Sequence, residues 1–173
     1  MESEQQTLEQ NQKETPLPLV TKVIVIGLCG GLLWSSISYL AYILNFTELS
    51  PNLVLLPWAI GDWKNQVLGN VIGIIVIGLL SILTALLYYG LFKKYDNLWV
   101  GILYGVGLWL LVFYLFNPIF PSLKDMNELS RNTVITTICV YILYGVFIGY
   151  SISFEVNELN DQSHPQQPST ENE

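Results

Sequence analysis

Six polar or charged residues stand out in this sequence because they flank long apolar segments, where such groups are costly unless they bind something. Asp62 and Arg131 carry opposite charges and are available as a pair. Amide side chains beside such a pair add hydrogen-bond donors and acceptors, which suits a lipid headgroup or a small polar solute. The candidate site at the outer face consists of Asp62, Lys64, Asn70, Asn117, Arg131 and Asn132.

Four apolar segments must position these residues, and each is long enough to cross a membrane as a helix. A hydrocarbon core of about 30 Å requires about 20 apolar residues in helical form. Lipid offers no partner to bare backbone groups, and the unbroken apolar character excludes strands. The expected spans are residues 23–44, 67–91, 98–116 and 133–154. The predicted fold class is therefore all-α, a polytopic membrane protein with a four-transmembrane-helix bundle.

Charge is concentrated outside this bundle. The chain is 51% hydrophobic and 12% charged, with a mean hydropathy of +0.45. Four of the fourteen acidic residues precede Lys22 and five follow Ser153, so the net charge of −7 belongs largely to the tails. Residues 1–22 and 155–173 are too polar to bury apolar area, and we expect both to be disordered. They are docking arms or simply solvate the ends, and we favour the second interpretation.

Basic residues in short flanks indicate which side is cytoplasmic. The side that holds both termini carries Lys13, Lys22, Lys93 and Lys94, and the other side carries Lys64, Lys124 and Arg131. Lys93 and Lys94 lie together in a tight connection directly after the second span. We therefore expect a multi-pass protein of the cell membrane with both termini in the cytoplasm.

The first extracytoplasmic loop contains an apolar stretch, residues 53–60 within SPNLVLLPWAIGDWKN. As a helix its eight apolar residues would cover only about 12 Å, so it cannot span the membrane. Ser50 and Pro51 are typical of an N-cap and a first helical position, and Pro57 predicts a second short turn ending at Gly61. The segment is an interfacial anchor or a lid over the bundle, and we favour the anchor. The tryptophans expected at headgroup depth are Trp58, Trp63 and Trp99.

Each span contains a Gly-x-x-x-Gly pattern, which lets two helix backbones approach closely in lipid. The pairs are Gly27 with Gly31, Gly69 with Gly73, Gly101 with Gly105, and Gly145 with Gly149. The sequence ILYGV also occurs twice, at residues 102–106 and 142–146. We interpret the repeat as two helices that each need a tyrosine beside a glycine on facing surfaces.

The spans themselves contain little catalytic chemistry. No ionisable residue falls within the predicted spans, and Glu155 stands just beyond the last one. His164, the one histidine, lies beside a proline in the C-terminal tail, which excludes an H-E-x-x-H site. Cys29 and Cys139 are predicted at different depths, too far apart for a disulfide, and are read as packing residues. We expect no metal, no cofactor and no enzymatic activity.

Several motifs resemble one known family. PNLVLLPWAIGDWKN, LLYYG, NPIFP, and RNT leading to LYGVFIGYSISFE look like the YqhR family of conserved bacterial membrane proteins. The resemblance covers the chain from about Lys22 to Glu155. It implies a four-helix integral membrane protein of Gram-positive, spore-forming bacteria, and the family brings no established activity with it.

Two functions are consistent with these observations. The first is a non-enzymatic scaffold or accessory protein of a membrane or envelope component, supported by the packing glycines and the lack of catalytic groups. The alternative is a small transporter or lipid-handling protein that uses the outer polar residues. The expected partners are membrane lipid and either another membrane protein or further copies of this chain, with no nucleic acid.

Overall fold

The computed structural model describes residues 18–57, 59, 61–92, 97–115 and 128–163. Its elements are α2 (Leu19–Ile43), η1 (Pro51–Leu55), η2 (Asp62–Asn65), α3 (Val67–Phe92), α4 (Leu98–Leu110), η3 (Leu111–Leu115) and α5 (Arg131–Ser163). Here η1 and η2 are short 3-10 helices, whereas η3 is a π-helical turn that continues α4. Within the described residues, four helical segments are long and apolar enough to cross a membrane. The all-α, four-span architecture expected from the sequence is thus confirmed.

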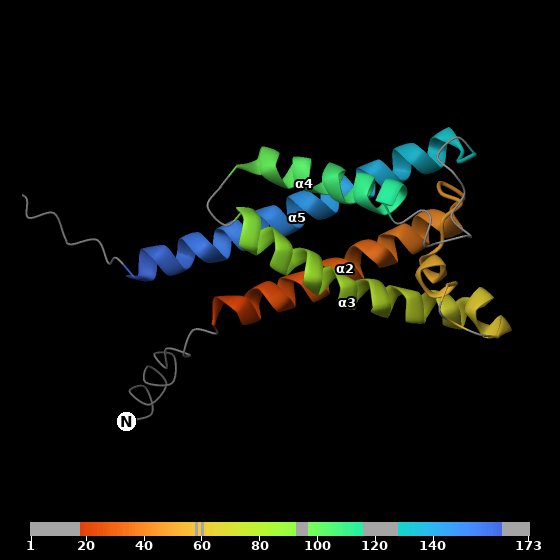
Figure 1. The fold of residues 1–173 in the computed structure, drawn as a ribbon, viewed down its shortest axis with the longest axis horizontal. Helices are drawn as coiled ribbons and strands as arrows, with labels where there is room; N and C mark the ends of the chain where they lie inside the picture. The colour runs from red at the N-terminus through yellow and green to blue at the C-terminus, as the bar shows by residue number, and fades with distance from the viewer. Residues whose placement is uncertain (1–17, 58, 60, 93–96, 116–127, 164–173) are drawn as a thin grey trace, which may run out of the picture.

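The spans form two antiparallel hairpins (Figure 1). Helix α3 packs along α2, and α4 packs along α5. Helix α2 also lies against α5, whereas α3 meets α5 only briefly. Figure 1 shows α2 and α3 crossing, so that α3 comes near the α4–α5 hairpin only toward its C-terminal end. We call the end of the bundle with Leu19 and Ser163 the termini end, and the opposite end the loop end.

Two helices are longer than the apolar pattern predicted. Helix α2 begins at Leu19 rather than at residue 23, directly after Pro18, whose extended backbone cannot continue a helix toward the N-terminus. Helix α5 continues to Ser163, although the sequence placed a disordered tail from residue 155. Apolarity marks where lipid ends, but a helix continues until a breaker stops it, and residues 155–163 contain no Gly or Pro.

The loop between α2 and α3 also differs in detail from the prediction. Ser50 and Pro51 do occupy the N-cap and first position of η1. The second short helix, however, is Asp62–Asn65 rather than a turn from Pro57 to Gly61. Gly61 has a φ of 108°, which an L side chain rarely adopts, so it redirects the chain between the two short helices.

A Schellman turn ends α2. Asn45 adopts the left-handed conformation with a φ of 60°. The Phe46 amide donates to the Ala41 carbonyl at 2.9 Å, and the Asn45 amide donates to the Tyr42 carbonyl at 3.0 Å. This pattern satisfies carbonyl groups that the helix end would otherwise leave bare.

The residues after this turn attach the first hairpin to the start of α5. The amide of Glu48 donates to the Thr133 hydroxyl at 3.0 Å, and the Thr136 hydroxyl donates to the Phe46 carbonyl at 3.2 Å. Thr133 is fully buried. The exit of α2 and the entry of α5 are therefore joined at the loop end.

Within the described residues, two buried clusters make up the core. The first lies among α2, α3 and α5 and contains Val23, Ala85, Tyr88, Tyr144, Ile148 and Ile152. The second contains Trp109, Phe113 and Leu129. In the second cluster the Trp109 and Phe113 rings stack at 5.0 Å, and the Trp109 indole donates to the Thr137 hydroxyl at 3.1 Å. Trp109, which precedes the π turn of η3, is thus held to α5 by a hydrogen bond.

Candidate functional site

Three of the four glycine pairs lie at helix interfaces. In the first hairpin, a Cβ atom built on Gly27 would stand 2.8 Å from the Ala85 Cβ, and one built on Gly31 would stand 2.8 Å from the Gly78 Cα. In the second hairpin, a Cβ on Gly145 would stand 2.7 Å from the Gly105 Cα. These distances are too short for a real Cβ contact, so the backbones touch because side chains are missing.

The remaining members of these pairs make similar contacts. A Cβ on Gly101 would stand 2.9 Å from the Gly145 carbonyl oxygen. A Cβ on Gly149 would meet the Tyr88 hydroxyl at 2.9 Å and the Gly101 Cα at 3.1 Å. Gly149 therefore contacts both α4 and α3.

The pair in α3, Gly69 and Gly73, packs against the loop and not against another helix. A Cβ on Gly73 would lie 2.4 Å from the Pro51 carbonyl oxygen, and one on Gly69 would lie 2.0 Å from the Lys64 carbonyl oxygen. The expectation that this pair joins two spans is therefore wrong. The physical reason is that a flat stripe of small residues accepts any close backbone, and η1 and η2 occupy this one.

Asn52 fixes the apolar loop to α3. Asn52 is 8% exposed. Its backbone N–H donates to the Asn70 side-chain oxygen at 3.3 Å, and its side-chain amide donates to the Lys64 carbonyl at 2.9 Å. The Lys64 ammonium donates to the Ala59 carbonyl at 3.0 Å. The segment therefore folds back along the first turns of α3. Sequence reasoning missed Asn52, although an amide next to Pro51 in an apolar stretch was a signal.

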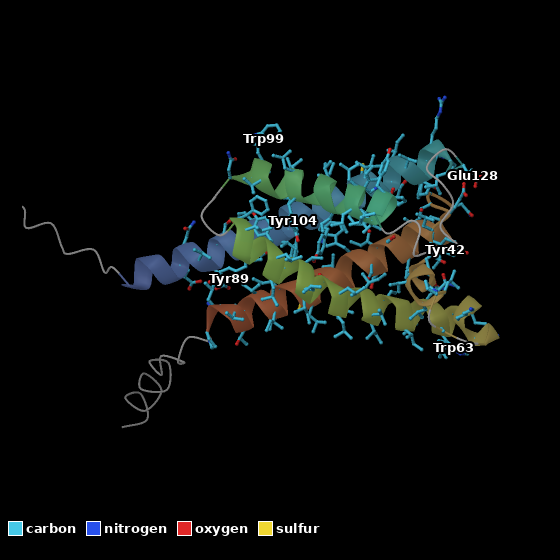
Figure 2. All side chains as sticks on the ribbon, viewed as in Figure 1. Tyr42, Trp63, Tyr89, Trp99, Tyr104 and Glu128 are labelled. Atoms are coloured by element: carbon cyan, nitrogen blue, oxygen red, sulfur yellow. The ribbon has the colours of Figure 1, made fainter. Side chains whose placement is uncertain are left out.

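The six outer polar residues predicted as one site fall into separate groups. Lys64 and Asn70 belong to the loop and α3, whereas Arg131 and Asn132 are exposed at the start of α5. Figure 2 shows Trp63, beside Lys64, and Glu128, just before α5, on opposite sides of the loop end. Asn117 and the side chain of Asp62 lie outside the described residues. The described members are therefore not brought together.

Among the described residues, another polar cluster lies inside the bundle, where α3 meets the other helices. The Tyr144 hydroxyl is 2.6 Å from the Ser81 hydroxyl and 2.5 Å from the Thr84 hydroxyl. The Ser81 hydroxyl also donates to the Gly27 carbonyl at 2.6 Å, and the Tyr104 hydroxyl donates to the Thr84 carbonyl at 2.6 Å. We call Ser81, Thr84, Tyr104 and Tyr144 the tyrosine node. Residues from α3, α4 and α5 meet there, bonded also to α2.

Each hydroxyl proton of the tyrosine node has an acceptor within the protein, and the proton of Thr84 has two. A carbonyl oxygen only accepts, so Ser81 must donate to Gly27. Ser81 then accepts from Tyr144. The Thr84 hydroxyl donates either to the Tyr144 oxygen or to the Ser81 carbonyl of its own helix. Tyr104 uses its own proton on the Thr84 carbonyl. All four hydroxyl protons thus have acceptors within the protein. A low-dielectric interior requires this, because an unpaired polar group is costly there.

Aromatic rings complete the node and fill the space between α3 and α4. The rings of Tyr88 and Tyr104 meet edge to face at 5.0 Å, and those of Phe92 and Tyr104 at 6.1 Å. Figure 2 shows Tyr104 reaching from α4 toward α3. The ILYGV repeat had singled out Tyr104 and Tyr144, and both reach the same threonine. Ser81 and Thr84 gave no signal of their own, because single hydroxyl residues are common in membrane helices.

One ion pair joins the hairpins at the termini end. The Lys22 ammonium contacts the Glu155 carboxylate at 2.5 Å, and each side chain is 22% exposed. Both residues lie within the described helices α2 and α5, one position outside the spans 23–44 and 133–154 that the apolar pattern predicts. Longer helices than expected bring these two charges side by side.

Cysteines and tryptophans complete the predicted set. Cys29 and Cys139 are free, as expected, but both are exposed on the outside of the bundle and are not packing residues. The depth of a residue along a helix does not determine which face of the helix it occupies. Trp63 and Trp99 are exposed, and Figure 2 shows Trp99 pointing away from the bundle. Trp58 lies outside the described residues. Among the residues described, no three His, Cys, Asp or Glu side chains form a metal-binding group.

Comparison with known proteins identifies a family of membrane proteins. Residues 3–167 match the family described as conserved membrane protein YqhR. A curated relative from Bacillus subtilis (strain 168), named uncharacterized protein YqhR, is 52% identical over 159 residues, covering 91% of this chain and 89% of the relative. No solved structure matches the chain. The resemblance inferred from the loop and helix motifs is confirmed, and the chain belongs to the YqhR family of conserved membrane proteins.

Proposed function

We propose that this protein is a non-enzymatic accessory protein that holds or assists another component of the membrane or envelope. The observation that supports it best is the closed bonding of the tyrosine node. A binding or catalytic site needs polar groups that converge on an opening. In the node, the hydroxyls of Ser81, Thr84, Tyr104 and Tyr144 bond to one another and to backbone instead. Its chemistry therefore serves helix association.

One buried polar atom in the described interior differs from this pattern. The indole nitrogen of Trp34 is buried and has no hydrogen-bond partner. Trp34 packs against the first core cluster, and an indole nitrogen has only a single donor and no basic lone pair. This group supplies neither a nucleophile nor a base, so it does not change the proposal.

A lipid-handling role is the second candidate, and it has its own observation. Arg131 and Asn132 are exposed at the loop end, at the first turn of α5. A guanidinium and an amide at that depth suit a phosphate headgroup. This role needs only one side of the loop end and does not require the six-residue site.

A single purification separates the two roles. The tagged full-length chain is extracted from its native membranes in mild detergent, and proteins and lipids in the same sample are quantified by mass spectrometry. A protein present in fixed ratio to the chain supports the accessory role. A lipid class enriched over the bulk membrane, without such a protein, supports lipid handling and refutes the accessory role. The Gly105→Leu variant, which parts α4 from α5, serves as the control and should lose a specific partner.

We also propose that both termini face the cytoplasm. Lys22 lies in the first turn of α2 at the termini end, and the connection at that end carries two further lysines. In a Cys29→Ser, Cys139→Ser background, Ser169→Cys should resist an impermeant maleimide on intact cells, and Glu48→Cys should react. The opposite labelling pattern would reverse the topology.

A further inference from the structure

The contacts inside each hairpin are close backbone contacts. Gly27 and Gly31 bring α2 against α3, and Gly105 and Gly145 bring α4 against α5, in each case within distances that leave no room for a Cβ atom. Such a surface cannot slide or part without losing packing along several turns. Each hairpin is therefore a rigid unit.

The contacts between the hairpins are made by side chains. Gly30 of α2 meets the Phe147 ring, and a Cβ built there would stand 2.9 Å from that ring. Tyr104 and Tyr144 reach α3 through their hydroxyls, and Lys22 reaches α5 through an ion pair. Side chains change rotamer or partner far more readily than a backbone surface does. The boundary between the hairpins is thus the compliant one.

These contacts are also unevenly distributed along α3. In the part of the chain that the structure describes, the hydrogen bonds and ring contacts from α3 to the second hairpin lie between Ser81 and Phe92. The half of α3 toward the loop end packs instead against η1 and η2. Figure 1 shows this half of α3 diverging from α4 and α5.

The Thr84 hydroxyl has two acceptors, so it can lose its bond to Tyr144 and still donate a hydrogen bond. Its hydroxyl lies 2.5 Å from the Tyr144 oxygen and 2.9 Å from the Ser81 carbonyl of its own helix. Ser81 donates to Gly27 within the first hairpin. If the hairpins shift, both α3 hydroxyls therefore remain bonded inside their own hairpin, and only the tyrosine hydroxyls need new partners.

We propose that the α2–α3 hairpin, carrying η1 and η2, rocks as one body against the α4–α5 hairpin about the tyrosine node, with the largest displacement at the loop end. The tether joins Thr133 and Thr136 of α5 to Phe46 and Glu48, which come after the end of α2 at Ile43, so on the side of the first hairpin it is attached to the loop and not to a helix. Motion of two packed bodies about a contact region is a common form of conformational change.

The test measures distances between spin labels in the full chain, reconstituted in lipid nanodiscs with Cys29→Ser and Cys139→Ser. Leu68→Cys with Ile135→Cys spans the two hairpins at the loop end, and Leu91→Cys with Phe154→Cys spans them at the termini end. All four side chains are exposed, so labels should not disturb packing. Tyr114→Cys with Ile135→Cys lies within the second hairpin and is the matched control.

The expected distance distribution of the loop-end pair is roughly two-fold wider than that of the control pair, or has two maxima, while the termini-end pair stays narrow. Adding Tyr104→Phe and Tyr144→Phe should shift the loop-end distribution and leave the control pair unchanged. Equally narrow distributions for all three pairs would overturn the proposal. So would a broad control pair, because the second hairpin would then not be rigid.

Discussion

Two glycines on α4, only two residues apart, should respond in opposite directions to the same substitution. A Cβ on Gly105 would lie 2.3 Å from the Tyr141 carbonyl oxygen and 2.8 Å from the Ile142 Cα. Gly107 has no atom within 4 Å of the position its Cβ would take. We expect Gly105→Ala to destabilise the protein and Gly107→Ala to stabilise it.

The magnitudes follow from these distances. Ordinary contact begins near 3.4 Å, so Gly105→Ala must part the α4 and α5 backbones by about 1 Å. Overpacking of this kind typically costs about 1–3 kcal/mol. Replacing glycine by alanine in a helix regains about 1 kcal/mol through helix propensity. The net loss at Gly105 is therefore up to about 2 kcal/mol, whereas Gly107 shows only the gain.

Thermal unfolding in one detergent, followed by far-ultraviolet circular dichroism, measures both variants. At about 3 °C per kcal/mol for a chain of this size, the two midpoints should differ by several degrees. Gly105→Leu should lower the midpoint further, since a longer side chain forces a larger separation. If Gly105→Ala and Gly107→Ala shift the midpoint equally and in one direction, close backbone packing does not hold the second hairpin together.

Three further outcomes follow from the other contacts. Gly73→Ala should push η1 away from α3, because the Pro51 carbonyl oxygen lies 2.4 Å from the position of the new Cβ. Limited proteolysis within residues 44–66 should then be faster, while the helical circular dichroism signal is retained. Tyr144→Phe should cost about 0.6 kcal/mol, a typical interhelical hydrogen bond in a membrane protein. Its effect should shrink in a Thr84→Val background and largely vanish when Ser81→Ala is added, because both hydroxyl partners of Tyr144 are then gone; full additivity would contradict their coupling. Glu155→Gln should lower the unfolding midpoint more at low salt than at high salt, because Lys22 then loses a partly exposed charge partner.

The spans could be predicted because their cause is simple: a stretch of about 20 apolar residues has to be a helix in lipid. Helix ends could not, because the polar residues 155–163 remain helical beyond the apolar segment. Glycine patterns identified close backbone contacts but not the partner. Gly73 and Gly105 read alike in the sequence, yet one packs against a loop and the other against a helix.

The polar chemistry was predictable only where the sequence repeated itself. Two copies of ILYGV singled out Tyr104 and Tyr144, and both proved to share an acceptor region on α3. Ser81 and Thr84 had no such signal. The outer polar residues seemed to form one site because each flanks a span at the loop end. Two spans that end at the same depth can still lie on opposite sides of a bundle, as the labelled neighbours of Lys64 and Arg131, Trp63 and Glu128, do in Figure 2.

The tyrosine node also has a consequence for the order of biosynthesis. Helices α2 and α3 leave the ribosome first, and Ser81 can bond to Gly27 and Thr84 to its own helix before α5 exists. Ser81 and Thr84 can therefore enter lipid with their hydroxyl protons already bonded within the first hairpin. The tyrosines, whose protons need acceptors on α3, arrive later on α4 and α5. The hydroxyl groups that still lack an acceptor are thus on the second hairpin, and the α3 groups that accept from them are already in place when it inserts.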